Sequence, residues 1–190
     1  MRKIVTLIAL FFPFMVLSAP VDGYKDLKFG MSLEDVKNNN KLCESAWRIP
    51  ADDNPIKVAA GFMICDKFAF NTSYIEVTLR FIGNKLQFIE LSLPKYPMYP
   101  KNKLITLLTQ KYGEPVVTKE DLLEGKKKKN KKESLIAEEY KFADGTVSLN
   151  VYHNNGKDEP ATIYYRSLEF INAPEGWSDD LSNKFLLEEL

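Results

Sequence analysis

The side chains that could carry out catalysis are few and scattered. His153 is the only histidine among the 190 residues, and it ends an alternating strand pattern beside a turn. A catalytic histidine needs a nucleophile and an orienting acid beside it, and nothing in the sequence places either near His153. Glu138 and Glu139 are adjacent, so in a strand they point to opposite faces rather than converging on a substrate. We therefore interpret His153 as a strand-end residue. A pair of distant carboxylates of the glycosidase kind stays open but has no support in the sequence.

No motif predicts a bound metal or a cofactor. Two cysteines and one histidine cannot complete a tetrahedral zinc site without carboxylates from scattered positions. The sequence contains neither a glycine-rich phosphate-binding loop nor a His-Glu-x-x-His motif. We expect a protein that is not an enzyme, with no catalytic residues, no metal and no cofactor.

The N-terminus has the parts of a secretory signal peptide. Arg2 and Lys3 form a positive region, and the apolar run 4–17 follows them. The alternative is a retained membrane anchor, but about fourteen residues are fewer than the roughly twenty that a spanning helix needs. Small residues near the end of the run allow cleavage after Ser18 or after Ala19, and we favour Ser18 because Pro20 would directly follow the other cut. We expect the mature protein to be periplasmic or secreted.

The two cysteines, Cys43 and Cys65, predict a structural disulfide. An even pair in an exported chain is typical of such a bridge, and the pair lacks the Cys-x-x-Cys spacing of a redox site. The bridge would close a loop of about twenty residues and stabilise the fold by roughly 3 kcal/mol. Cys65 has the opposite strand parity from Phe62 and Ile64. We therefore expect the bridge on the face of the sheet that Phe62 and Ile64 do not occupy.

The overall charge is balanced, with 26 basic and 26 acidic residues, and does not favour nucleic acid as a partner. The exception is a lysine-rich loop between 125 and 133, which repels itself and stays solvated. Two interpretations stay open: a solvated loop tip, or a surface that binds anionic lipid or lipopolysaccharide. The lysines of this loop are Lys126, Lys127, Lys128, Lys129, Lys131 and Lys132.

Alternating apolar residues predict two antiparallel meanders of three strands each. The first covers 58–93 and the second covers 136–170, with hairpin turns at Gly83, Gly145 and Gly156. In the second meander, a change of parity near Arg166 and Ser167 predicts a bulge in the last strand. In the first, the face expected to be buried on the leading strand carries Val58, Ala60, Phe62, Ile64, Phe68 and Phe70.

Helices are predicted beside the two meanders. Ser32 and Asp35 form the capping box of a short first helix. Apolar residues at helical spacing between 104 and 112, followed by Gly113, predict a second helix. Ser178 begins a helix at the C-terminus.

The order of these elements repeats about 73 residues apart. The predicted fold class is therefore α+β, with two helix-plus-three-strand antiparallel meander repeats and a C-terminal helix. We divide the chain into a signal peptide at 1–18, a first repeat at 19–96 and a second repeat at 97–190. The second repeat includes the lysine-rich loop and the C-terminal helix. Whether the two halves arose by duplication stays open.

The segment Gly30-Met31-Ser32-Leu33-Glu34-Asp35-Val36 resembles the helix-opening motif of two related groups. One is the secreted beta-lactamase inhibitor proteins, which are tandem helix-plus-sheet repeats. The other is the small lipoprotein of the outer-membrane barrel-assembly machinery, whose lipidated cysteine this chain lacks. The letters match over seven residues, and only the order of elements extends the resemblance further. No functional residue is carried over. The resemblance implies a fold and a tendency to bind proteins in the cell envelope or outside it.

Together these features favour an exported, non-enzymatic protein that binds another envelope protein, as an inhibitor, an immunity factor or an assembly accessory. The alternative is a binder of anionic envelope components through the lysine-rich loop, and a third possibility is a purely structural role. Tyr152 and Tyr164 fall on the outward parity of the second meander. Because tyrosine is enriched at interface hot spots, we predict that they flank one another at the centre of a partner-binding surface. The competing interpretation is ordinary cross-strand pairing.

Overall fold

The computed structural model describes residues 20–50, 61–94, 99–122 and 134–174. Its helices are α1 (Leu33–Asn38), α3 (Lys101–Tyr112) and α4 (Leu168–Ile171), with short 3₁₀ turns at Asn40–Leu42 and Ala143–Gly145. A small hairpin is formed by β1 (Gly23–Tyr24) and β2 (Leu27–Lys28). The other strands are β3 (Phe62–Phe70), β4 (Ser73–Ile82), β5 (Lys85–Ser92), β6 (Val116–Asp121), β7 (Leu135–Phe142), β8 (Val147–Asn154), β9 (Lys157–Asp158) and β10 (Thr162–Arg166).

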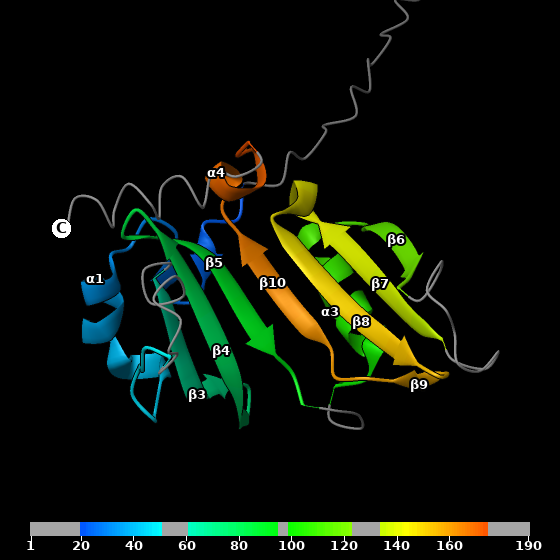
Figure 1. Ribbon diagram of the computed structural model, residues 1–190, viewed down its shortest axis with the longest axis horizontal. Coiled ribbons are helices and arrows are strands. Elements are labelled where there is room, and N and C mark those ends of the chain that lie inside the picture. The colour runs from blue at the N-terminus through cyan, green and yellow to red at the C-terminus, as the bar shows by residue number, and fades with distance from the viewer. Residues whose placement is uncertain (1–19, 51–60, 95–98, 123–133, 175–190) are drawn as a thin grey trace, which may run out of the picture.

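These eight strands form one antiparallel sheet. Its order is β3-β4-β5-β10-β8-β7-β6, and β9 pairs with β8 beside this path. The two halves of the chain meet where β5 pairs with β10, from Phe88 opposite Arg166 to Ser92 opposite Thr162. The sheet is therefore continuous across the whole molecule (Figure 1).

The fold is mostly β, so the predicted α+β class of two helix-plus-three-strand repeats is wrong. Helices α1 and α4 have six and four residues, too few to form a helical layer in each half. The second half also has a further strand, β6, at the sheet edge. Alternation identified the strands but not their neighbours, and the pairing of β5 with β10 turns two predicted units into one sheet. The predicted signal peptide, lysine-rich loop and C-terminal helix lie outside the described residues.

One face of the sheet holds the core. Register places the buried side chains in rows across the strands. The N-terminal hairpin packs on this face, where the Tyr24 ring lies 4.9 Å from the Tyr165 ring. Helix α3 packs behind β7 and buries Leu104 and Leu108 (Figure 1). The longest row consists of Met63, Leu79, Ile89, Tyr165, Val147 and Phe142.

The predicted capping signals are confirmed. The Ser32 hydroxyl accepts a hydrogen bond from the Asp35 backbone N–H at 3.1 Å. The Asp35 carboxylate accepts one from the Ser32 N–H at 3.0 Å. At the end of α3, Gly113 has a φ of 87°, and its N–H donates to the Thr109 carbonyl at 2.9 Å. Local chemistry therefore sets where both helices begin or end.

The predicted buried face of β3 is wrong at Phe62 and Ile64 but correct at Phe68 and Phe70, and the predicted Val58 and Ala60 lie outside the described residues. A register shift between Cys65 and Phe68 puts Met63, Cys65 and Phe68 in the core, while Phe62 and Ile64 lie on the other face. The strand is apolar on both parities, so alternation alone could not select the inner one. The predicted Cys43–Cys65 disulfide is present, and it lies on the core face, away from Phe62 and Ile64.

The last strand is shorter than predicted and has no bulge. It ends at Arg166, and the Ser167 hydroxyl accepts a hydrogen bond from the Phe170 N–H at 2.9 Å. The parity change near these residues therefore marks the N-cap of α4 rather than a bulge.

Candidate functional site

The second face of the sheet, here called the open face, carries mostly half-exposed side chains. In the described part of the chain, no helix lies over its centre, because α3 is on the far side and α4 lies at one end (Figure 1). Each side chain alternates with a core residue on its own strand. The central row runs through Ile64, Thr78, Glu90, Tyr164, Ser148 and Lys141.

An aromatic and arginine cluster lies on the open face toward the end that α4 occupies, where the Phe88 ring also lies 5.6 Å from the Phe170 ring of α4. The Phe88 and Tyr164 ring centroids are 5.3 Å apart. The Arg166 guanidinium carbon lies 5.1 Å from the Tyr164 centroid and 5.9 Å from that of Phe88. Arg166 also donates to the Ser148 hydroxyl at 3.0 Å, which fixes its position. Aromatic rings and arginine are the side chains that most often dominate binding energy at protein interfaces.

Glu90 is a half-buried carboxylate beside this cluster. Burial raises its pKa, and the nearby Glu76 raises the pKa further. No basic group within the described ranges forms an ion pair with it. Glu139, on the same face, differs because it lies 3.3 Å from the Lys141 ammonium and 3.6 Å from the Arg166 guanidinium. Of these two carboxylates, Glu139 is therefore neutralised by neighbouring cations and Glu90 is not.

Both predicted tyrosines are half-exposed on the open face. Tyr164 pairs with Ser148, whereas Tyr152 pairs with Ala137, and the Asn150–Thr162 pair lies between the two tyrosines. Burial raises the pKa of Tyr164, and Glu90 and Tyr152 raise it further. Tyr152 also borders a recess of about 410 Å³ together with Thr118, Lys119, Glu120, Leu122, Ala137, Glu139 and Asn150. The two tyrosines therefore lie on one surface but are not cross-strand partners of each other.

A charged cluster that the sequence interpretation missed lies on the core side of the sheet. The Glu138 carboxylate, with 11% of its side chain exposed, lies 3.1 Å from the Lys101 ammonium and 3.0 Å from that of Lys119. It also accepts a hydrogen bond from the Tyr140 hydroxyl at 2.9 Å and lies 3.3 Å from the His153 Nε2. The sequence did contain one signal for this position, because Glu138 has the same strand parity as Tyr140, which was expected to face the core.

The environment of Glu138 has opposing effects on its acidity. Burial by itself would raise the pKa of this carboxyl group, but hydrogen bonds from Lys119, Tyr140, Lys101 and His153 lower the pKa far below its usual range. Glu138 is therefore a charged anchor that ties the first residue of α3 to three strands. His153 lies near the end of β8, as predicted, and takes part in this anchor.

In the described part of the chain, no group of three or more His, Cys, Asp or Glu residues is arranged to hold a metal ion. No helix of the described ranges has the length and apolar character needed to cross a membrane.

Comparisons with known proteins identify relatives of the whole chain. A protein-family model described as "Uncharacterised protein" matches residues 24–177. The uncharacterized protein PM0314 of Pasteurella multocida (strain Pm70) is 41% identical over 197 residues, and the match covers 100% of both chains. No solved structure matches this chain.

Proposed function

The chain belongs to the family described as "Uncharacterised protein", and we propose that it is an exported, non-enzymatic protein that binds another protein through its open face. Export is supported by the signal-peptide pattern of residues 1–18. It is also supported by the Cys43–Cys65 disulfide, because such bridges persist in oxidising compartments such as the periplasm or the exterior of the cell.

The observation that carries the proposal is Glu90 beside Phe88 and Tyr164. A carboxylate that is partly removed from water without a cation is unfavourable, and its raised pKa reflects that cost. A lysine or arginine of a partner would supply the missing charge. The adjoining rings would supply apolar contact area that is already held in place by Arg166. We therefore infer a partner that presents a basic side chain flanked by apolar groups.

A protein partner fits this surface better than a small ligand does. The open face is a broad strip of half-exposed side chains that crosses β4, β5, β10 and β8. Interfaces between proteins have this extent, whereas small-molecule sites are concave. The one described recess on this face, beside Tyr152, occupies only the part of the face formed by β6, β7 and β8. The resemblance of the Gly30–Val36 segment to envelope protein binders points the same way. The alternative proposal, binding to anionic lipid, depends on six lysines outside the described residues.

Affinity capture tests this function with matched baits. The mature wild-type protein is immobilised and exposed to envelope extract, in parallel with Glu90→Lys and Glu139→Gln baits. We expect one stoichiometric partner on the wild-type and Glu139→Gln baits, and its loss on the Glu90→Lys bait because two like charges would then meet. The proposal fails if no stoichiometric partner is captured, or if the Glu90→Lys bait retains it.

A further inference from the structure

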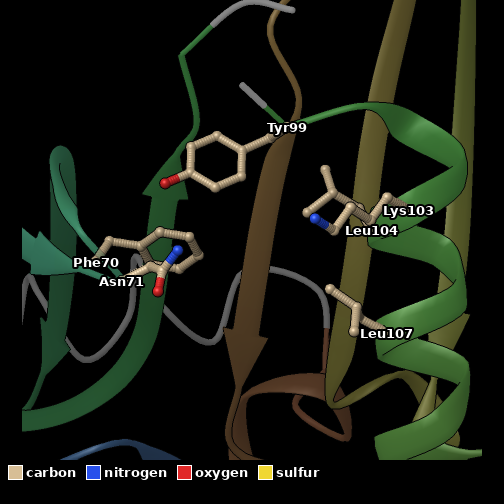
Figure 2. A pocket seen from close by; sticks show the side chains of 6 residues that line it. All are labelled: Phe70, Asn71, Tyr99, Lys103, Leu104 and Leu107. Carbon is tan, nitrogen blue, oxygen red and sulfur yellow. The ribbon is translucent and has the colours of Figure 1, made fainter. Parts of the chain in front are cut away.

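A separate recess lies on the side of the sheet that α3 covers, between α3 and the turn after β3 (Figure 2). Its volume of about 360 Å³ falls within the roughly 300–1,000 Å³ of small-molecule sites. It shares no lining residue with the open face. The side chains around it are Phe70, Asn71, Tyr99, Lys103, Leu104 and Leu107.

The walls of this recess are apolar and held in place. The Phe70 and Tyr99 rings meet edge to face, with centroids 5.4 Å apart. The Tyr99 hydroxyl is fixed by a hydrogen bond of 2.8 Å with the Ser73 hydroxyl. Leu104 is buried, but Leu107 is 52% exposed, although it lies beside these apolar groups. An apolar ligand would therefore cover Leu107 without rearranging the walls.

The polar groups at the recess are one cation and one amide. Figure 2 shows Lys103 extending from α3 toward Tyr99, with Asn71 beside Phe70 on the other wall. In the described part of the chain the Lys103 ammonium forms no ion pair, whereas Lys101 is held by Glu138 at 3.1 Å. An apolar wall with a single available cation complements an apolar chain that ends in an anion.

We propose that this recess binds a free fatty acid of medium length. The alkyl chain lies against Phe70, Tyr99, Leu104 and Leu107, and the carboxylate meets the Lys103 ammonium. A peptide would fit less well because its backbone needs several hydrogen-bond partners. The Tyr99 hydroxyl is already engaged with Ser73, which leaves few groups on these walls for that purpose.

Calorimetric titration of the mature protein with hexanoate, octanoate and octanol tests the site. Each added methylene that enters an apolar site tightens Kd by about fourfold, so two should tighten it by about sixteenfold. We expect octanoate to bind more tightly than hexanoate by about that factor, and more tightly than octanol. Methyl NMR shifts should concentrate on Leu104 and Leu107.

Three variants separate the carboxylate contact from apolar binding. Lys103→Gln should weaken octanoate binding by about threefold and leave octanol unchanged, because an exposed ion pair contributes little. Lys111→Gln, at the other end of α3, should change neither. Leu107→Asn should weaken both ligands, and a thermal melt checks that it remains folded.

Several results would overturn the site. One is the absence of saturable binding, and another is methyl shifts located away from α3. A third is that octanoate and octanol bind with equal affinity both to the wild type and to Lys103→Gln. Tighter binding of a peptide ending in leucine would assign the recess to peptides instead. A dimer that Leu107→Asn abolishes would assign it to a second copy of the chain.

Discussion

Phe88 of β5 and Tyr164 of β10 lie in contact across the strands that join the two halves of the sheet, with ring centroids 5.3 Å apart. Their contact exists only because residues 88 and 164, far apart in sequence, are brought together by the pairing of β5 with β10. The centre of the proposed binding surface is therefore made by both halves of the chain.

Replacing both Tyr152 and Tyr164 with serine should abolish partner binding. Both rings are half-exposed, so the loss of cross-strand contacts should cost about 1 kcal/mol and lower Tm by less than about 4 °C. Differential scanning calorimetry and a titration with the captured partner measure the two effects. Val117→Ser is a suitable control, because Val117 is 52% exposed on the other side of the sheet, opposite Tyr140. A large fall in Tm with binding intact would mean that the tyrosines serve only the fold.

Glu138→Gln should destabilise the protein far more than Glu139→Gln. Neutralising Glu138 leaves Lys101, Lys119 and His153 around an uncharged group, and we expect a loss of about 2 kcal/mol in the free energy of unfolding. Glu139 is more exposed and faces two cations near solvent, so its loss should be below about 1 kcal/mol. Urea unfolding at pH 7 measures both variants. Equal losses would contradict the anchoring role of Glu138.

The contribution of Glu138 should also depend on pH. Its pKa in the folded state is lowered from the usual 4.5, so the folded state favours the charged form. This stabilisation is fully present above the unfolded pKa and is lost as the pH falls toward the folded pKa. The difference between wild type and Glu138→Gln should thus shrink in urea unfolding below about pH 4.5. A difference that stays constant from pH 7 to pH 3 would exclude a charge-based role.

Glu90→Gln should have the opposite effect on stability. Burial and Glu76 raise the pKa of Glu90, so the charged form is disfavoured in the folded state at pH 7. Replacement with the neutral amide should raise Tm at pH 7, and the gain should vanish below about pH 3.5, where the wild-type carboxyl is protonated in both states. The same variant should bind the partner more weakly. If Glu90→Gln lowers Tm at pH 7, Glu90 is not held at a cost to stability.

Removal of the disulfide should lower stability substantially. Cys43 and Cys65 are 22 residues apart in sequence and both are buried. Replacing both with serine should reduce the free energy of unfolding by about 3 kcal/mol, chiefly by releasing a constraint on the unfolded chain. Reducing agent should lower the urea midpoint of the wild type and leave that of the double variant unchanged. An unchanged midpoint for the reduced wild type would contradict a stabilising bridge.

Much of the fold could be predicted where local chemistry decides it. The alternation of Ile75, Val77 and Leu79 gave the correct inner face of β4, and the pairing of Ser32 with Asp35 marked the start of α1. Both signals act within a few residues of one another. They can therefore be recognised in the sequence without knowledge of the tertiary structure.

The errors arose where distant segments decide the outcome. The parity of β3 was misassigned because Phe62 and Ile64 are as apolar as Met63 and Cys65, and only pairing with β4 and the register shift distinguishes them. No local sequence pattern indicates the pairing of β5 with β10 either. For the candidate site, the outward parity of Tyr152 and Tyr164 could be predicted. The neighbours Phe88 and Glu90 could not, because they come from the other half.

Site-specific photocrosslinking in intact cells tests the central claim most directly. A photoreactive phenylalanine derivative is placed at position 164 on the open face, and at Gln110, an exposed residue of α3 on the opposite side, as a control. The proposed function predicts one crosslinked adduct of defined size at position 164, absent at position 110 and lost when Glu90→Lys is added. No adduct at position 164, or the same adducts at both positions, would contradict a partner on the open face.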